Sequence, residues 1–571
     1  MTEGRRVELA RVLFAYASAR RWFRGKARSF KEASIVDWVP LPRERADYGV
    51  ALLRVEYNDA SANETYVVPL GFAYGGAAER LIKGSPSATV ARLEGGPEGG
   101  ILFDATHDRL FAELLLEHLR RRVASQGERG QLIATTYRGF KELGAGEEEL
   151  VPRVPEVEQS NSTIVYGDRM LLKLYRVAEE GPNAEQEIGR FFAEQANFTH
   201  APAVVASLEY RGKGRDTATI AVVQRFVPNR GSAWQVTLDE LDRYYERVLT
   251  ASSDSPVSPV RPAGALLDQA STEPPEALAA LLGSYPSTAR LLGRRTAEMH
   301  VALSSDPEDA AFAPEPFTTM YQQSIFQSAH ALLVRTFESL RSQLGPLEGE
   351  TAERAQALLA REPEIDARLR KLVQPRLEGR RMRIHGDYHL GQVLSTGDDF
   401  VIVDFEGEPA RHLVERRYKR GPLRDVAGMV RSFQYAATTA LRNGRLRPED
   451  AAHLRPWAEA WADWASAAFV GAYFEIMRGT PVVPESDATS NRMLCFYLLE
   501  KCIYEIGYEL NNRPAWLNVP LIGLERLLEP PPNPTHPTSV AVNVTVDDRA
   551  EHGPPSQRGA RLTTSKPPTS E

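Results

Sequence analysis

The spacing of apolar residues divides the chain into a β-rich part and a longer helical part. Apolar and polar residues alternate around 51–57 and 65–72, which predicts strands, because successive side chains of a strand point to opposite faces. Apolar residues three and four positions apart predict long helices near 278–303, 321–344, 455–478 and 493–510. Strands followed by helices predict an α+β protein with two lobes and a cleft between them.

The β-rich part contains a predicted hairpin. Two apolar runs, 163–166 and 170–175, are separated by a short turn that begins with Gly167 and Asp168. Glycine and aspartate are typical of tight turns between paired strands, although the order here is Gly-Asp. A helical pattern follows over 185–195. The segment therefore predicts two antiparallel strands and then a helix.

Composition indicates a folded protein of several units. The chain has 571 residues, of which 42% are hydrophobic and 25% are charged, as in globular proteins. At roughly 100–200 residues per domain, this length predicts about three units. The patterns divide the chain into blocks at 7–123, 131–228 and 229–529.

Two polar segments interrupt or follow these blocks. Residues 530–571 contain nine prolines and no Phe, Trp or Tyr, so we expect a disordered tail that cannot bury enough apolar surface to fold. A short alternation at 540–546 within it is a weak candidate strand. The Ser- and Pro-rich stretch 251–276 is expected to be a long surface loop.

Charge and cysteine content limit the cellular setting. The net charge is −7, which argues against broad binding to nucleic acid or to anionic membranes, since both need a clustered basic face. Only Cys495 and Cys502 are present, and no apolar run approaches the ~20 residues of a membrane helix. The N-terminus has no apolar signal sequence. We therefore expect a soluble cytoplasmic enzyme with neither a nucleic-acid nor a membrane partner.

The window 384–408 carries the clearest chemistry. It contains IHGDYHLGQ and VIVDFEGE, so that Asp387 and Asp404 flank a short predicted strand and Gln392 follows Asp387 by five residues. Phosphoryl transfer needs a carboxylate that accepts the proton of the acceptor hydroxyl, and oxygen ligands for the Mg²⁺ that neutralises nucleotide phosphates. Protein kinases place Asp and Asn at the same offset and a second Asp before Phe. The window therefore favours a kinase.

A lysine upstream supplies the remaining group. Lys173 lies in the apolar run LLKL, where a charge should face a specific partner. In kinases a helix glutamate holds such a lysine so that it grips the nucleotide phosphates. Of Glu185 and Glu187, we choose Glu187 because it directly precedes the apolar run 188–192. The turn before the hairpin has groups suited to cover phosphates, although it lacks the glycines of a G-x-G-x-x-G loop: Ser160, Asn161 and Ser162.

Two other features have competing interpretations. His385 and His389 bracket Asp387 and raise a zinc site as an alternative, but Gly386 and Gly391 indicate a loop and no further ligands follow at zinc spacing. A later helix places four side chains on one face: Lys501, Tyr504, Glu505 and Tyr508. This face is either a sugar-binding surface of aromatic and charged groups or a solvated or inter-helix face, and the sequence leaves both open.

At this point the sequence resembles the bacterial maltokinases, including those fused to trehalose synthase. The resemblance runs from about 19 to 528 and rests on seven segments: RRWFRGKAR (20–28), SNSTIVYGDRMLLKLYR (160–176), GRRTAEMH (293–300), HGDYHLGQ, VDFEGEPARHLVERR, PLRDVAGMVRSF and EKCIYEIGYELNNRPAW (500–516). The HGD and DFE pieces are shared by all aminoglycoside-phosphotransferase-like kinases, whereas Gln392 and DFEGEPA are more specific. Arg24 departs from the glycine that is usual in this family, which leaves the local turn of the cap in doubt.

The resemblance implies a bilobal protein-kinase-like fold with an N-terminal cap subdomain at 1–125. A β-rich nucleotide-binding lobe is then expected at 126–228 and a helical lobe at 229–529, before the tail at 530–571. The implied reaction transfers phosphate from ATP, with Mg²⁺, to the anomeric hydroxyl of maltose and gives maltose 1-phosphate. Trehalose synthase is a candidate partner.

The resemblance also assigns roles to individual residues. Asp387 is similar to the catalytic base, Gln392 and Asp404 to the Mg²⁺ ligands, and Lys173 with Glu187 to the phosphate-anchoring pair. Further expected positions are His385 and Asp425 as supports of the catalytic loop, Gln224, Phe226 and Val227 as the hinge that receives adenine, and Glu406 beside the sugar with the 501–508 helix face.

Two rivals remain open. A glucosamine or aminoglycoside kinase would share this core, but its site should present several carboxylates to a cationic ligand, whereas a maltose site should rely on aromatic rings and neutral hydrogen bonds. A catalytically inactive nucleotide-binding regulatory module is the rival of another class. The joint presence of Lys173, Asp387, Gln392 and Asp404 argues against it.

Overall fold

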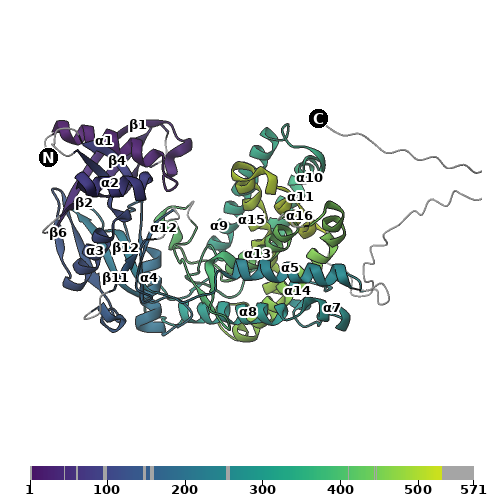
Figure 1. The fold of residues 1–571 in the computed structure, drawn as a ribbon. Helices are drawn as coiled ribbons and strands as arrows, with labels where there is room; N and C mark the ends of the chain where they lie inside the picture. Colours follow the sequence, from purple (N-terminus) through teal and green to yellow (C-terminus); the bar gives the residue numbers. More distant parts are fainter. Residues whose placement is uncertain are drawn as a thin grey trace, which may run out of the picture.

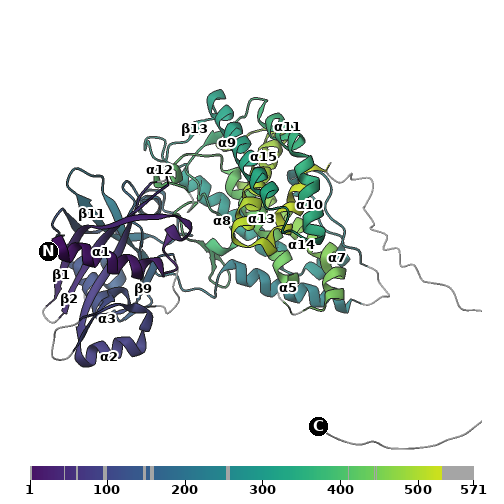
Figure 2. The same cartoon turned by 90° about the horizontal axis from the view of Figure 1, so that it is seen from above.

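The structure is a computed structural model that describes residues 3–43, 46–59, 62–93, 99–145, 150–154, 160–251, 257–408, 411–442, 444 and 446–529. The predicted tail at 530–571 and the alternating run 540–546 lie outside these residues. Figure 1 shows a part rich in strands beside a part built of helices, with α12 (Leu413–Arg416) between them, and Figure 2 shows the same relation from above. The α+β, two-lobed architecture expected from the sequence is confirmed.

The N-terminal part is built around a five-stranded antiparallel sheet of order β1-β2-β3-β5-β4. The long strands carry continuous buried apolar runs, as at 50–53 and 66–68, where Leu53 pairs with Tyr66 in the adjacent strand. Such runs are typical of strands that are covered on both faces. The elements of this part are α1 (Glu3–Ser18), β1 (Phe30–Arg43), β2 (Ala46–Tyr57), β3 (Glu64–Tyr74), α2 (Gly75–Gly84), β4 (Thr89–Leu93), β5 (Gly100–Asp104) and α3 (Arg109–Arg121).

A second sheet has seven strands in the order β6-β7-β11-β12-β10-β9-β8. The predicted hairpin is confirmed, since β9 (Ser162–Tyr166) and β10 (Met170–Leu174) pair antiparallel and Gly167 has a φ of +52° that suits glycine. The predicted helix begins as α4 (Ala184–Phe191) and ends in a wider turn over Phe192–Ala196. The other strands are β6 (Ala124–Gln126), β7 (Gly130–Thr136), β8 (Pro152–Arg153), β11 (Val204–Gly212) and β12 (Ala218–Arg225).

The two sheets are joined next to the strand that carries Lys173. The backbone N–H of Val67 in β3 donates to the carbonyl of Arg176 at 2.9 Å. The guanidinium of Arg176, which is 2% exposed, donates to Thr106 and forms a 2.9 Å ion pair with Asp104 at the end of β5. One apolar cluster also includes residues of both sheets. The N-terminal sheet therefore packs on the second sheet as one body.

The helical part follows β12, and its apolar faces form the largest core cluster. Its principal helices are α5 (Ala233–Thr250), α7 (Glu276–Leu282), α8 (Tyr285–Leu303), α9 (Thr319–Ser342), α10 (Gly349–Ala360), α11 (Glu362–Val373), α13 (Leu423–Arg442), α14 (Pro448–Met477), α15 (Asp487–Asn512) and α16 (Asn518–Leu528). The predicted helix at 278–303 is two helices, because Gly283 adopts a φ of +61° that ends α7. Short strands complete this part: β13 (Glu315–Pro316), β14 (Arg380–Arg381), β15 (Val393–Ser395) and β16 (Phe400–Ile402).

The Ser- and Pro-rich segment at 251–276 is anchored to the helical part. Residues 252–256 lie outside the described ranges, but the remainder contains α6 (Leu266–Gln269), whose Leu267 is buried. Arg261 pairs with Asp463 of α14, and Trp464 donates its indole N–H to the carbonyl of Val260 at 2.9 Å. Most of 257–276 is irregular and lies at the surface, as predicted, but these contacts hold it against the helical part. Within the described ranges, every helix is too short or too polar to cross a membrane.

Candidate active site

The loop that carries Asp387 is braced from below by a buried carboxylate. Asp425, at the start of α13, accepts hydrogen bonds from the backbone N–H groups of His385 and Gly386 at 2.8 and 2.9 Å. It is also 3.1 Å from Nε2 of His300. These bonds satisfy the turn and leave the Asp387 side chain, which is 25% exposed, at the surface of a cavity. Asp425 and His385 thus occupy the supporting positions expected from the sequence.

Charge around Asp425 keeps it ionised. Burial by itself would raise the pKa of this carboxyl, but the hydrogen bond from His300, the charges of His300 and His385, and the N–H of Gly386 lower the pKa below its ordinary value of 3.8. An ionised Asp425 accepts both loop N–H bonds at full strength. The bracing of the catalytic loop is therefore electrostatic as well as steric.

His385 links the two acidic segments. One ring nitrogen of His385 bonds the carbonyl of Val403 at 2.9 Å, directly before Asp404. Asp404 has a φ of +68°, an uncommon backbone conformation for a residue other than glycine. The arrangement aims the Asp404 carboxylate toward Lys173 of the other lobe, since Nζ of Lys173 lies 2.5 Å from Oδ1 of Asp404.

Lys173 lies among three carboxylates. Its Nζ atom donates to Oε2 of Glu185 at 2.9 Å and to Asp404, and it also contacts Glu406. Burial opposes the charge of Lys173, but Asp404, Glu185 and Glu406 together raise its pKa well above the ordinary 10.5. The same ammonium lowers the pKa of Asp404 against the effect of burial, whereas burial raises the pKa of Glu406. The cluster therefore holds a charged lysine where β10 and α4 meet the segment that follows β16.

The expected partner of Lys173 was Glu187, and this prediction is wrong. Glu185 is 2% exposed and faces the sheet, where it also accepts hydrogen bonds from Tyr175 and Gln224. Two residues along an α-helix correspond to a rotation of about 200°, so Glu187 points away from Lys173. Glu187 instead pairs with Arg383 of the catalytic segment and with Arg417 after α12.

The donor set beside Asp387 fits a magnesium ion. Nε2 of Gln392 donates to Oδ2 of Asp404 at 2.7 Å, so the two side chains meet and the amide oxygen of Gln392 is left for a metal. Carboxylate and amide oxygens, completed by waters and substrate phosphates, form typical Mg²⁺ sites. Oxygen atoms of Glu185, Asp404 and Glu406 also lie within 4.8 Å of one another, but the Lys173 ammonium already lies among them. Gln392 and Asp404 are therefore the residues that would hold the ion.

The turn expected to cover the phosphates is tied to both lobes. Asn161 donates to Oε1 of Glu406 at 3.0 Å, and Ser162 accepts a hydrogen bond from Arg176 at 2.8 Å. Ser160 is exposed at the start of the turn. Glu406, expected beside the sugar, is instead partly buried and lies between Asn161 and Lys173.

The segment expected to receive adenine is only partly available. Gln224 is buried and its amide bonds Glu185, so that side chain supports the lysine pair. Phe226 donates its backbone N–H to the carbonyl of Arg169 at 2.8 Å and cannot also donate to a purine without breaking this bond. Val227 accepts a hydrogen bond at its carbonyl from Asn229 at 2.8 Å. The adenine role of this segment stays a prediction.

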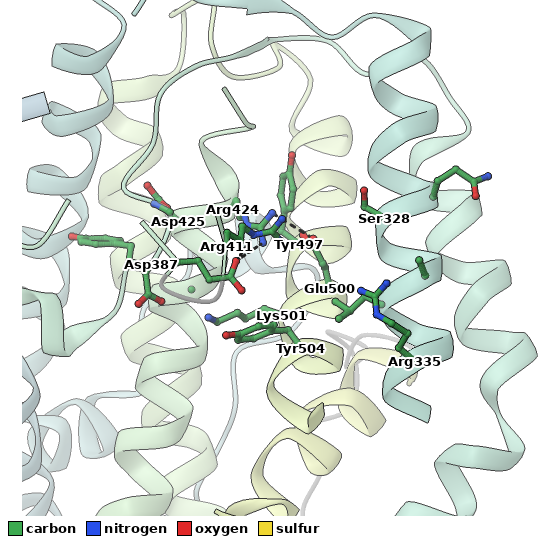
Figure 3. A pocket seen from close by; sticks show the side chains of 17 residues that line it. Ser328, Arg335, Asp387, Arg411, Arg424, Asp425, Tyr497, Glu500, Lys501 and Tyr504 are labelled. Atoms are coloured by element: carbon green, nitrogen blue, oxygen red, sulfur yellow. Dashed lines mark hydrogen bonds and ion pairs between the residues drawn. The ribbon is translucent and has the colours of Figure 1, made fainter. Parts of the chain in front are cut away.

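A cavity of about 400 Å³ opens beside Asp387 in the helical part. Figure 3 shows Lys501 and Tyr504 extending from α15 toward the side of the cavity where Asp387 lies, with Ser328 and Arg335 on α9 across from them. Two of its carboxylates are paired with arginines: Arg411 donates to Glu408 at 2.6 Å, and Arg424 lies 3.4 Å from Glu500. Arg411, Arg424 and Lys501 lower the pKa of Glu408 against the effect of burial.

The predicted helix face on α15 is split by the structure. Lys501 and Tyr504 line the cavity. Glu505 is buried and accepts a hydrogen bond from Nε of Arg431 of α13 at 2.8 Å. Tyr508 is 45% exposed and lies outside the cavity lining. Positions three or four apart share only part of a face, so neighbouring helices divide the stripe between them.

Several cavity residues were missed from the sequence. Glu408, Arg411, Arg424, Glu500 and Ser328 line the cavity but belong to four segments that are distant along the chain. Arg424 carried a signal because it directly precedes Asp425 in the RDVAGM motif. Glu408, Arg411 and Glu500 lie in other segments that carried the family resemblance, whereas Ser328 lies outside all of them. Glu185 lies in the same helix as Glu187, and its burial against the sheet is what makes it the partner of Lys173.

Comparisons with known proteins agree with this geometry. Residues 16–108 match the family model of the maltokinase N-terminal cap domain, and residues 270–447 match that of the phosphotransferase enzyme family. Two curated relatives are named glucosamine kinase. The relative from Streptacidiphilus jiangxiensis is 25% identical, and the match covers 65% of this chain and 72% of the relative. The relative from Mycolicibacterium smegmatis is 26% identical, and the match covers 65% of this chain and 78% of the relative.

A solved structure supports the fold. The chain is similar to the structure of a glucosamine kinase in complex with glucosamine, ADP and inorganic phosphate, with a TM-score of 0.56 and 19% identity. The match covers 90% of this chain and 99% of the glucosamine kinase chain. The chain therefore joins a maltokinase N-terminal cap domain to a catalytic domain of the phosphotransferase enzyme family, and it is a kinase of the aminoglycoside-phosphotransferase-like superfamily.

Proposed function

We propose that the protein transfers a phosphoryl group from ATP to the anomeric hydroxyl of maltose and forms maltose 1-phosphate. The observation that carries the kinase part is that Asp404 forms hydrogen bonds with both Lys173 and Gln392, while Asp387, earlier in the same segment, lines a cavity. This is the set of groups that phosphoryl transfer requires.

In this mechanism Asp387 orients the acceptor hydroxyl and accepts its proton as the new bond to phosphorus forms. Lys173 holds oxygens of the nucleotide phosphates, and Glu185 keeps the ammonium in place. A Mg²⁺ ion held by Gln392 and Asp404 would supply charge neutralisation on the phosphates. The turn with Asn161 and Ser162 lies over the same cluster, where it would limit access of water.

Maltose is favoured by the charge of the cavity. The carboxylates Glu408 and Glu500 face Arg411 and Arg424, and Lys501 adds a cation near Asp387. A cationic amino sugar would meet few unpaired carboxylates here, whereas a neutral sugar can bond these charged groups through its hydroxyls and stack on Tyr504. The match of the cap to the maltokinase cap model supports the same acceptor.

Glucosamine is the second candidate acceptor. It is supported by the curated relatives named glucosamine kinase, which are 25% and 26% identical to this chain. The cavity argues against it, since Lys501 would repel an ammonium group that approached Asp387.

A direct assay separates these candidates. Purified protein with radiolabelled ATP and Mg²⁺ should label maltose, and phosphorus–proton NMR should place the phosphate at the anomeric carbon. Labelling of glucosamine or of an aminoglycoside in preference to maltose would overturn the proposed acceptor. Absence of labelling with all three, in protein that binds ATP, would favour the inactive regulatory module.

A further inference from the structure

A second cavity lies on the other side of Arg411, between α12, β14 and the first half of α9. Its volume is about 660 Å³, and it shares only Ser328 and Arg411 with the cavity beside Asp387. Ser324 and Ser328, one turn apart on α9, present exposed hydroxyls to it, and the ring of Tyr321 forms part of its wall. We call this cavity the basic groove.

Cations dominate the lining of the basic groove. Six of them contribute: Arg381, Arg383, Arg411, Arg417, Lys419 and Arg420. Four carboxylates pair with these cations, and two are shared, because Glu187 serves both Arg383 and Arg417 while Glu315 serves both Arg381 and Lys419. The other two, Glu408 and Glu415, pair with Arg411. The groove is therefore left with about two positive charges in excess.

Two arginines of the groove have unused donors. The side chain of Arg383 is 2% exposed, and among the described residues its buried Nη2 atom has no hydrogen-bond partner. Arg420 has no carboxylate at ion-pair distance in the described part of the chain, although Arg411 and Arg424 lie close enough to lower its pKa together with burial. A buried guanidinium N–H without a partner is costly, so Arg383 favours an anion in the groove. Arg420 is half-buried, and its positive charge attracts an anion to the same place.

We propose that the basic groove is a binding site for a phosphomonoester of a small molecule, such as a sugar phosphate. A phosphate monoester carries about two negative charges at neutral pH, which equals the excess in the groove, and its three oxygens suit planar guanidinium donors. Arg383 and Arg420 supply those donors, and the hydroxyls of Ser324 and Ser328 suit the polar remainder of the ligand. This inference goes beyond the proposed function, because it holds for any acceptor at Asp387.

The groove adjoins the reaction site without containing it. Arg383 precedes Asp387 by four residues, and Arg411 contributes to the walls of both cavities. A ligand bound to these arginines would therefore contact the same segments that shape the acceptor cavity. This position suits a phosphorylated compound that modulates acceptor binding.

Isothermal titration of the full chain with glucose 6-phosphate, inorganic phosphate and glucose tests the site. Wild-type protein and the nucleotide-site variant Lys173→Met should bind glucose 6-phosphate equally, and neither should respond to glucose at the same concentration. Arg420→Gln should weaken binding about tenfold, the scale of one lost hydrogen bond to a charged group, whereas Arg420→Lys should retain most of it. The matched control is Arg294→Gln, which removes one positive charge from an exposed side chain of α8 outside the groove.

Several outcomes would overturn the proposal. The proposal fails if the wild type does not bind glucose 6-phosphate, or if it binds inorganic phosphate but not this ester. It also fails if Lys173→Met loses binding of glucose 6-phosphate, or if Arg420→Gln binds it as tightly as the wild type does. Circular dichroism checks that each variant is folded. If Arg420→Gln does not fold, Lys419→Gln provides the same test on a neighbouring groove cation.

Discussion

The Nζ atom of Lys173 lies 2.9 Å from Oε2 of Glu185, and this pair joins strand β10 of the second sheet to helix α4. Glu185 is held in turn by Tyr175 and Gln224, so its orientation depends on two strands and one helix. Glu187, two residues later, pairs with Arg383 and Arg417 of the helical lobe. One turn of α4 therefore connects the phosphate-binding lysine to the catalytic segment.

This division of roles predicts different defects for two similar variants. Glu185→Gln should lower kcat/KM for ATP at least about tenfold, because the lysine loses the charge that positions it. Glu187→Gln should keep the Lys173 pair but lower the free energy of unfolding by about 2 kcal/mol, since buried Arg383 loses a charged partner. Steady-state kinetics and urea unfolding of both variants provide the measurement. Equal kinetic defects would contradict the assignment.

Asp387→Asn should retain the fold and lose at least about 10²-fold in kcat, the usual contribution of a positioned general base. Asp398→Asn, in the exposed turn between β15 and β16, is the matched control and should have wild-type turnover. Near-normal turnover of the Asp387 variant would exclude this residue as the base.

Tyr504→Ala should raise KM for the sugar about tenfold without changing KM for ATP, because Tyr504 lines the acceptor cavity and an aromatic face contributes to sugar stacking. Tyr508→Ala removes an equal side chain from the exposed side of the same helix and should leave both constants unchanged. The expectation fails if the two variants behave alike in initial-rate measurements with each substrate varied.

Arg176→Met should lower the free energy of unfolding by about 3–5 kcal/mol, because Asp104 would remain buried without its cation. The change should also loosen the turn at Ser162, which accepts a bond from Arg176. Denaturant titrations followed by tryptophan fluorescence measure the loss, with Arg211→Met at an exposed position of β11 as control. Adding Asp104→Asn to Arg176→Met should restore part of the lost free energy of unfolding. A double variant that is less stable than Arg176→Met alone would argue against a simple ion pair.

The pH dependence of stability should depend on Asp425. The folded-state pKa of this group lies below the ordinary value of 3.8, so its stabilising contribution is complete above about that pH and is lost as the pH falls through the folded pKa. The difference in unfolding free energy between wild type and Asp425→Asn should therefore be largest at neutral pH and shrink below about pH 3.8. A difference that stays constant down to pH 3 would contradict this linkage.

Much of the local structure could be predicted from short-range patterns. The hairpin over 162–174 and the helices α9, α14 and α15 follow from residue spacing, which requires no knowledge of distant segments. The anchoring of 257–276 could not be predicted, because it depends on Asp463 and Trp464, about 200 residues away along the chain. Local composition carries no information about such partners.

The candidate site shows the same division. Asp387, Gln392 and Asp404 could be recognised together because they lie close in sequence within one loop and one short hairpin. Glu187 was chosen over Glu185 because the sequence does not show which face of α4 meets the sheet. The sequence likewise does not show which side chains of α15 reach the cavity. Lys501 and Tyr504 line it, whereas Glu505 faces α13 and Tyr508 faces solvent.

The sequence by itself determined the order of strands and helices and the chemical groups of a kinase, because these depend on neighbouring residues. The tertiary structure alone decided which groups meet: Lys173 and Asp404 are 231 positions apart, yet they form one hydrogen bond. The tertiary structure also decided that Glu408 pairs with Arg411 beside Tyr504, and that cations are in surplus in the basic groove. Charges on distant segments balance only after packing brings them together, and residue spacing does not encode that balance.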